Sequence, residues 1–203
     1  NVKDKFLKKE IKKEKIYSKI VNVDIRFFKR NLALIKNPYF STEGNQQNLS
    51  FIFALAKNFK LKKNILFKTI NKFKGLKFRQ QIIFKSKKFT LINDSKATSY
   101  ASSLDVLKSL KKVFWIIGGI PKKGDKFLLS KKDSLNIKAY IFGKNRNYFV
   151  KHLKNKVKSQ VFKNLEQALK KIVLDIKLEK NDQHKTILFS PSAASFDSFK
   201  NFE

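Results

Sequence analysis

Apolar residues at helical spacing dominate the first third of the chain. They predict a helix over Asn48–Phe59, with an inward stripe at i, i+3, i+4 and i+7 formed by Leu49, Ile52, Phe53 and Ala56. A second helix is predicted over Lys62–Phe73, and Gly75 follows it as the glycine that commonly ends a helix. Before these segments, Lys8–Lys15 is a charge-rich candidate helix and Ile16–Val23 is a candidate strand.

After Gly75 short apolar runs alternate with amphipathic segments, so we place a domain boundary near Gly75–Lys77, between residues 1–75 and 76–203. Strands are predicted over Arg79–Phe84, Lys88–Ile92, Val113–Ile117, Ile137–Phe142, Gln160–Phe162 and Thr186–Phe189, the first two forming a β-hairpin. Helices are predicted over Ala97–Leu110, Asn147–Leu153 and Asn164–Ile176. Strands that alternate with helices imply an α/β fold: a mainly parallel, Rossmann-like sheet with helices on both faces.

Composition excludes several classes of function. Cysteine is absent, so disulfides and thiolate metal sites are excluded. No apolar run reaches the roughly 18 residues that a membrane span needs. Methionine is absent even at position 1, and Ser190–Glu203 reads as a strand end followed by a helix that stops without a cap. We therefore expect the chain to be a piece of a longer protein.

The net charge of +32 raises the alternative of a basic nucleic-acid-binding module. However, 43 of the 47 basic residues are lysine, whereas arginine is the residue expected for bidentate recognition of bases and phosphates. The lysines are spread along the whole chain, and Lys, Asn, Ile and Phe are abundant together, as an A+T-rich genome would produce. We therefore expect solvated lysine faces and no specific nucleic-acid partner, with non-specific adhesion to polyanions at low salt.

Small hydroxyl residues, glycines and lysine gather where three predicted strands end. The segments are Ile92–Thr98, Gly118–Asp125 and Ser190–Phe202. The carboxyl ends of parallel strands share one edge of a sheet, where α/β proteins bind ligands. We therefore expect Thr98, Lys122 and Ser195 to meet there. Two hydroxyls, an ammonium group and the N–H groups of a helix N-terminus would form a site for a carboxylate or a phosphate.

Each of these features also has a purely structural interpretation. Thr98 or Ser95 would cap a helix, and Gly118-Gly119 would form a turn. Lys122 is one lysine among many, and Ser195 would be another cap. The convergence of three such segments on one edge is what favours a functional site over these separate interpretations.

The same segments contain features of two other kinds of site. Gly119 and Gly124 have P-loop spacing, but Asp125 and Lys126 follow where Lys and then Ser or Thr are required, which excludes a P-loop here. A metal site is only weakly indicated by Asp94, Asp125 and Asp197, because flanking ligands at fixed spacing are missing. We assign no metal ligand.

Together these motifs resemble those of the Mur ligases of peptidoglycan synthesis, and among them the members that add D-glutamate. The resemblance is most specific in Asn93–Thr98 and Ser190–Glu203. It extends to Gly118-Gly119 with Lys122, Asp125 and Phe127, to Gly75-Leu76 with Arg79, and to Asn45–Asn48 before a helix. It is firm from Asn45 onward and loose before it.

The resemblance implies that residues 1–75 form the C-terminal part of a central ATP-binding domain. Residues 76–203 would form the C-terminal, D-glutamate-binding domain, truncated at its end. It implies a cytoplasmic, ADP-forming ligase that uses ATP and Mg²⁺ to join D-glutamate to UDP-N-acetylmuramoyl-L-alanine through an acyl phosphate, in cell-wall biogenesis and thus cell shape and division. The P-loop, the Mg²⁺ ligands and the UDP-sugar domain would lie in a missing N-terminal part. The 203 residues alone are therefore expected to be inactive.

Residue roles follow from the same resemblance. Asn45 and Asn48 would contact adenine, and Asp94 would hold the ribose. Arg79 would reach the ATP phosphates and compensate charge during transfer, with Lys96 near them, so these two are the candidate catalytic residues. The carboxylates of D-glutamate would be held by Thr98, Lys122, Ser195, Phe196 through its amide, and Phe202.

Three positions depart from the family pattern. Gly44 and Phe78 stand where the family usually has His, and Ser192 stands where Cys is common. The first departure affects the expected adenine contact, and the second removes a polar group beside Arg79. A related alternative is a ligase of the Mur or folylpolyglutamate type that uses another amino acid.

Overall fold

A computed structural model describes residues 5–14, 20–21, 23, 26–179 and 183–194. The chain divides into two compact units, Asn1–Lys74 and Gly75–Glu203, which we call the N-terminal unit and the C-terminal unit. The division falls at Gly75, where the sequence pattern changes.

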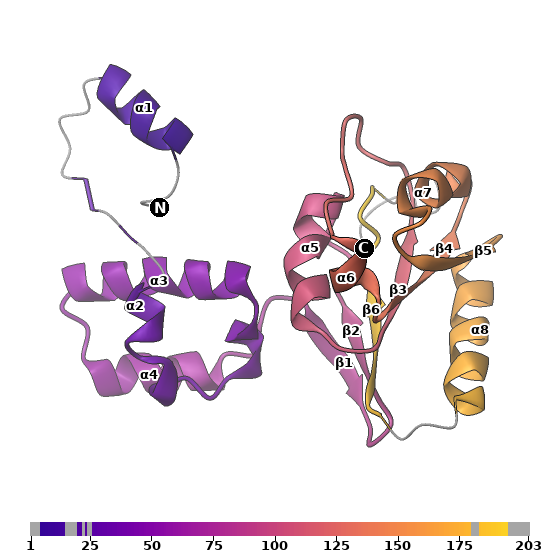
Figure 1. The fold of residues 1–203 in the computed structure, drawn as a ribbon. Helices are drawn as coiled ribbons and strands as arrows, with labels where there is room; N and C mark the ends of the chain where they lie inside the picture. The colour runs from indigo at the N-terminus through magenta and orange to yellow at the C-terminus, as the bar shows by residue number, and fades with distance from the viewer. Residues whose placement is uncertain (1–4, 15–19, 22, 24–25, 180–182, 195–203) are drawn as a thin grey trace. The chain divides into compact units, whose positions relative to one another are not determined.

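The N-terminal unit contains helices and no strand among its described residues (Figure 1). Its elements are α1 (Lys5–Lys13), α2 (Arg26–Lys29), the 3₁₀ turns η1 (Leu32–Leu34) and η2 (Pro38–Ser41), α3 (Glu43–Asn58) and α4 (Lys63–Lys72). Its core consists of Phe28, Phe40, Leu49, Phe53 and Ile70. The candidate strand Ile16–Val23 lies largely outside the described residues, and those of its residues that are described belong to no strand.

Helix α3 begins at Glu43, earlier than the predicted start at Asn48. The reason is Thr42, whose side chain accepts a hydrogen bond from the Asn45 N–H at 3.4 Å and so caps the helix. Glu43 adds an acidic side chain to the first turn, which complements the helix dipole. Asn45 and Asn48 therefore lie within the helix and not before it.

Helix α4 ends where a side chain from an earlier turn satisfies its last carbonyl groups. The Asn37 amide Nδ2 donates to Ile70 O at 2.8 Å and to Phe73 O at 2.7 Å. Phe73 itself is extended, with φ −64° and ψ 122°. Gly75, predicted to end this helix, lies beyond its end at φ +80°.

The C-terminal unit is built on one six-stranded sheet in the order β1-β2-β6-β3-β4-β5. The strands are β1 (Gln81–Lys85), β2 (Phe89–Asn93), β3 (Val113–Gly118), β4 (Ile137–Phe142), β5 (Lys158–Phe162) and β6 (Lys185–Phe189). The helices are α5 (Tyr100–Ser109), α6 (Lys131–Ser134), α7 (Arg146–Leu153) and α8 (Leu165–Leu178). β1 and β2 pair antiparallel and every other pair is parallel, which confirms the predicted hairpin and the mainly parallel sheet.

Apolar cores lie on both faces of this sheet, as predicted. All of β3 is buried, and its residues alternate between the two faces. Trp115 and Ile117 belong to the cluster that includes residues of α5 and α7. Phe114 and Ile116 belong to the cluster that includes Ala168 and Ile172 of α8. Figure 1 shows α5 and α8 on opposite sides of the sheet.

Helix starts in this unit depend on which of several candidate caps is used. Helix α5 begins at Tyr100 and not at Ala97, because Ser99 caps it in a reciprocal capping box with Ser102. Neither Ser95 nor Thr98 is therefore the cap. Helix α8 is capped by Asn164, the first residue of the predicted range Asn164–Ile176, and the short helix α6 was not predicted.

Candidate functional site

The predicted edge of the sheet exists, because the strands that carry the three motifs are neighbours. β6 lies between β2 and β3 and is parallel to both. Their carboxyl ends therefore point the same way, and the chain leaves them at Asp94, Ser190 and Gly119. Hydrogen bonds join the segments that follow these strands.

The loops after β3 and β6 form a small antiparallel bridge. Ile120 N–H donates to Ala194 O at 2.6 Å, and Ala194 N–H donates to Ile120 O at 3.1 Å. Gly119 makes this approach possible: its φ is +123°, and a Cβ there would lie 2.4 Å from Ala194 O. At Gly118 a Cβ would lie 2.3 Å from Phe142 O. Both glycines are thus required by close backbone contacts.

The loop after β3 also folds onto the start of α5. Asp125 Oδ2 accepts a hydrogen bond from Tyr100 N–H at 2.5 Å, and the Tyr148 hydroxyl donates to Asp125 O at 3.2 Å. Lys122 precedes Asp125 in this loop and Thr98 precedes Tyr100, and both side chains are exposed. The segments that carry Thr98 and Lys122 therefore meet at the N-terminus of α5.

Part of the predicted site lies outside the described residues. Ser195, Phe196 and Phe202 belong to it, as does the helix expected after Ser190. Ser190–Ala194, which is described, is not helical. These three side chains and their roles remain predictions.

Asp94 is the buried acid at this edge, with 5% of its surface exposed. It accepts hydrogen bonds from Gln80 N–H at 3.1 Å and from the Ser190 hydroxyl at 2.9 Å. Burial raises the pKa of Asp94 to about 6, against the lowering effects of these two hydrogen bonds and of the Arg79 charge. The carboxylate is therefore held in a fixed orientation close to a cation.

Arg79, Asp94 and Lys96 are brought together by two contacting turns. Lys96 N–H donates to Phe78 O at 3.1 Å, next to the contact between Gln80 and Asp94. Phe78 and Gln80 both have left-handed backbone, with φ +65° and +48°. Such strain in non-glycine residues is concentrated at functional sites. The charge of the exposed Arg79 acts on the buried acid, and Lys96, also exposed, follows Asp94 by two residues.

Asn45 and Asn48 lie one turn apart on α3 in the N-terminal unit. Asn45 is buried, and its Nδ2 donates to Tyr39 O at 2.7 Å, so its amide helps to hold η2 against the helix. Asn48 is exposed. The adenine contact of this pair remains a prediction.

A buried group of serine hydroxyls was missed by the sequence reasoning. Ser103 of α5 lies 2.7 Å from Ser190 Oγ and 2.6 Å from Ser192 Oγ, and Ser190 in turn contacts Asp94. A signal was available: Ser103 lies between Tyr100 and Leu107 on the apolar stripe of α5, where a hydroxyl requires a partner.

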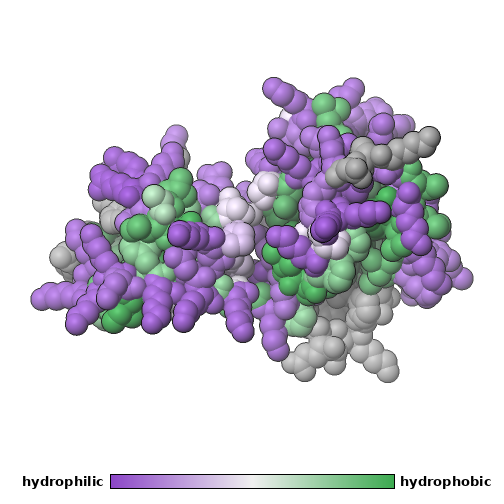
Figure 2. Space-filling model, turned by 90° about the horizontal axis from the view of Figure 1, so that it is seen from below, coloured by the Kyte–Doolittle hydropathy of each residue, from purple (hydrophilic) through white to green (hydrophobic). Residues whose placement is uncertain are grey.

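The described part of the chain includes no group of three or more His, Asp or Glu side chains that could hold a metal ion. Within the same residues no helix is long and apolar enough to cross a membrane. Figure 2 shows hydrophilic side chains over much of the visible surface of each unit, with hydrophobic residues among them.

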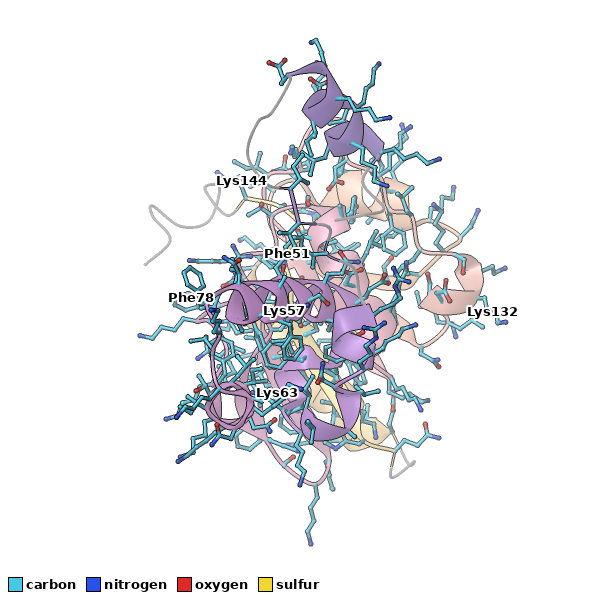
Figure 3. All side chains as sticks on the ribbon, turned by 90° about the vertical axis from the view of Figure 1, so that its left-hand side faces the viewer. Phe51, Lys57, Lys63, Phe78, Lys132 and Lys144 are labelled. Carbon is cyan, nitrogen blue, oxygen red and sulfur yellow. The ribbon has the colours of Figure 1, made fainter. Side chains whose placement is uncertain are left out.

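The lysines come from many separate elements. Figure 3 labels Lys57 of α3, Lys63 of α4, Lys132 of α6 and Lys144 after β4. Side chains with nitrogen at their tips project in many directions in this view. The cations therefore do not form one stripe on a single helix.

No protein-family model matches the chain. Curated relatives named UDP-N-acetylmuramoylalanine–D-glutamate ligase do match it. The one from Rickettsia felis is 35% identical over 159 residues, which cover 78% of this chain and 35% of the relative. The one from the Wolbachia of Brugia malayi is 31% identical over 186 residues, covering 92% of this chain and 37% of the relative. The one from Francisella tularensis is 31% identical over 175 residues, which cover 84% of this chain and 41% of the relative. The chain thus spans about two fifths or less of the length of these relatives.

Solved structures show the same fold at low sequence identity. A MurF crystal structure from Acinetobacter baumannii has a TM-score of 0.56 at 19% identity and covers 78% of this chain and 36% of its own. MurF ligase from Thermotoga maritima, solved in complex with ADP, has a TM-score of 0.51 at 14% identity. The match covers 75% of this chain and 36% of the MurF chain. The named relatives, the shared fold and the joined strand-end segments agree: this chain belongs to the Mur ligase family.

Proposed function

We propose that this chain is part of an ATP-dependent ligase that adds D-glutamate to UDP-N-acetylmuramoyl-L-alanine in peptidoglycan synthesis. The observation that carries the proposal is the meeting of three strand-end segments at one edge of the sheet. Asp94 contacts Ser190, Tyr100 contacts Asp125, and Ile120 pairs with Ala194. The names of the curated relatives supply the reaction and the amino acid.

The nucleotide side of the proposed site consists of Arg79, Asp94 and Lys96, with Asn45 and Asn48 as the proposed adenine contacts. An exposed arginine and an exposed lysine on the two turns that meet at a buried, oriented carboxylate suit a phosphate chain attached to a ribose. Arg79 would compensate charge on the transferring phosphoryl group. Asp94 would use the lone pairs that Gln80 and Ser190 do not occupy to accept a ribose hydroxyl.

The amino-acid side of the proposed site consists of Thr98 and Lys122, together with Ser195, Phe196 and Phe202. A dicarboxylate needs donors at two separated points, and the meeting of the segments that carry Thr98 and Lys122 at the start of α5 supports this assignment. Holding the amine of D-glutamate against an acyl phosphate is catalysis by positioning. In that step the new C–N bond forms as the bond to phosphate breaks, and inorganic phosphate leaves.

The remaining features of the reaction are proposed for the full-length ligase. Its UDP-sugar-binding domain, its P-loop and its Mg²⁺ ligands would be supplied by sequence beyond these 203 residues. ADP and phosphate would be its products, and the cytoplasm, where both nucleotide substrates occur, its location. Without the other parts we expect no turnover by this chain.

The experiment is a substrate panel with the full-length ligase. Phosphate release is measured with ATP, UDP-N-acetylmuramoyl-L-alanine and each of D-glutamate, L-glutamate, L-alanine, L-lysine and diaminopimelate. Turnover with D-glutamate alone supports the proposal. Preference for a diamino acid would replace it with the alternative of another amino-acid ligase in this family.

A matched pair of lysines tests the site itself. Lys122→Ala should raise the KM for D-glutamate at least about tenfold, since a charge-assisted contact is lost. Lys123→Ala, which changes the adjacent exposed lysine, should leave the KM unchanged. Equal effects of the two changes would show that only the general positive charge of the loop matters.

A further inference from the structure

A continuous chain of buried side chains runs beneath the proposed site. Asp94, Ser103, Ser190 and Ser192 come from three separate segments of the sequence, and each is at most 5% exposed. Their contacts are short: Asp94 to Ser190 at 2.9 Å, Ser190 to Ser103 at 2.7 Å, and Ser103 to Ser192 at 2.6 Å. The chain thus connects the end of β2, the loop after β6 and the second turn of α5.

The direction of the hydrogen bonds follows from counting protons. Each hydroxyl has one proton, and Ser190 donates its proton to the carboxylate of Asp94. Ser103 must then donate to Ser190. The Ser192 hydroxyl lies 3.4 Å from Ser190 O but only 2.6 Å from Ser103 Oγ, and it donates over this shorter contact to Ser103. A chain of donors that ends on a buried carboxylate is mutually reinforcing. Ser103 is its central member, because it alone contacts both serines of the loop after β6.

The loop held by Ser103 is also held by its backbone. Trp115 Nε1 donates to Ser190 O at 2.8 Å, and Gly118 N–H donates to Pro191 O at 3.3 Å. Ser192 has left-handed backbone, with φ +55°, a conformation that costs a non-glycine residue free energy. Its hydroxyl contact with Ser103 offsets part of that cost and fixes the path of the chain toward Ala194.

We infer that Ser103 is a positioning residue of the ligase site: through Ser190 it orients the Asp94 carboxylate, and through Ser192 it fixes the loop that leads to the amino-acid side. This inference rests on the proposed function. It predicts that one hydroxyl on α5, which touches neither substrate, sets the affinity for ATP and for D-glutamate together.

The test is steady-state kinetics of the full-length ligase with Ser103→Ala. The KM for ATP and the KM for D-glutamate should each rise about tenfold, as expected for one lost buried hydrogen bond. The KM for UDP-N-acetylmuramoyl-L-alanine and kcat should change less than about twofold. A merely structural role would instead lower the amount of active enzyme, and so lower kcat with all three KM values unchanged. That result would overturn the inference.

Ser109→Ala is the matched control. Ser109 is on the same helix, but its hydroxyl donates to Val106 O within that helix and is not part of the chain of serines. The three KM values of Ser109→Ala should equal those of the wild type. A rise in the KM for ATP or for D-glutamate comparable to that of Ser103→Ala would overturn the inference, because any hydroxyl of α5 would then have the same effect.

A second variant keeps the inference testable even if Ser103→Ala does not fold. Ser192→Gly removes a hydroxyl but relieves the backbone strain at φ +55°, so it should be as stable as the wild type. Its KM for D-glutamate should still rise. In the double variant Ser103→Ala/Ser192→Gly the KM for D-glutamate should rise no further than in Ser103→Ala alone, because Ser192 donates to Ser103. Additive effects would overturn the inference.

A measurement without turnover separates this inference from the proposed function. If the wild type does not ligate D-glutamate, the proposed function fails, and the Asp94 carboxyl resonance of ¹³C-aspartate-labelled protein still tests the chain of serines. Asp94 faces Ser190, the Gln80 N–H and the Arg79 guanidinium. Ser103→Ala should raise its titration midpoint and Ser109→Ala should not. An unchanged midpoint would contradict the role of Ser103.

Discussion

Ile120 and Ala194 exchange two backbone hydrogen bonds, of 2.6 and 3.1 Å, although they follow different strands of the sheet. This bridge holds the loop after β3 against the loop after β6. It places the segment that contains Lys122 beside the last described residues before Ser195. The amino-acid side of the proposed site therefore depends on a backbone contact that tolerates no side chain at Gly119.

Gly119→Ala should destabilise the protein more than Gly124→Ala. Both glycines have positive φ, +123° and +78°, but only at Gly119 would a Cβ collide, at 2.4 Å from Ala194 O. Gly124→Ala should lower the unfolding free energy by about 1 kcal/mol, from backbone strain alone. Gly119→Ala should lower it by at least about 2 kcal/mol more, because the collision is added. Urea denaturation of the two variants measures the difference. Equal losses would mean that the bridge between Ile120 and Ala194 is dispensable.

Asp94 should make the protein less stable as the pH rises from 4 to 6. Burial raises its pKa from 3.8 to about 6, so in this window the folded state holds a proton that the unfolded state has released. Its contribution to the unfolding free energy is complete below pH 4 and is lost as pH passes 6, a change of about 3 kcal/mol. Denaturant titrations at several pH values should show this slope in the wild type. The slope should be missing in Asp94→Asn, and a slope of the same size in that variant would assign the effect to other groups.

Asp175 should make the protein more stable as the pH rises, the opposite of Asp94, and it should do so at lower pH. Burial by itself would raise its pKa, but hydrogen bonds from Lys138, Lys171 and Tyr140 outweigh that effect and lower it to about 2. Its contribution to stability is present above about pH 4 and is lost as the pH falls through 2.

Asp175→Asn should therefore reduce the unfolding free energy at pH 7 by about 1–3 kcal/mol, allowing for solvent screening at Lys138, whose side chain is 32% exposed. Glu166→Gln breaks the exposed pair with Lys170, whose side chains are 70% and 74% exposed, and removes the first-turn acid of α8. It should lower the unfolding free energy only slightly, and much less than Asp175→Asn does. Thermal or urea denaturation of the two variants decides. The interpretation is wrong if Asp175→Asn is as stable as Glu166→Gln.

The positive charge should produce adhesion to nucleic acid without specificity. With a net charge of +32 and only four arginines, binding to duplex DNA at 50 mM salt should be independent of sequence. It should disappear by about 300 mM salt, because counterion release weakens it steeply. Fluorescence anisotropy with several unrelated duplexes measures both properties. Tight, sequence-selective binding at the higher salt would favour the nucleic-acid-binding alternative.

The 203-residue chain should release no phosphate from ATP in the presence of D-glutamate and UDP-N-acetylmuramoyl-L-alanine, while the full-length ligase does. The chain contains no P-loop sequence, and the only P-loop-like spacing is followed by Asp125 and Lys126. A malachite-green assay on both proteins is sufficient. Turnover by the short chain would place the phosphate-transfer groups within these residues.

Local sequence was most informative where a mostly apolar strand ends at a glycine. β4 has the predicted bounds, Ile137–Phe142, because a run that is apolar except for Lys138 ends there at Gly143. Helix starts were less accurate, since several polar residues compete for one cap. Thr42 and Ser99 are the caps of α3 and α5, and which candidate wins depends on the path of the preceding turn.

The sequence by itself determined the alternation of strands and helices, the mainly parallel sheet and the three segments at its carboxyl edge, because hydrophobic periodicity and strand ends are local properties of the chain. Only the tertiary structure decided which side chains at that edge touch. Ser103 and Ser190 are 87 positions apart, and their contact is set by how α5 packs on the sheet. The raised pKa of Asp94 likewise comes from burial and through-space partners, which no local pattern specifies.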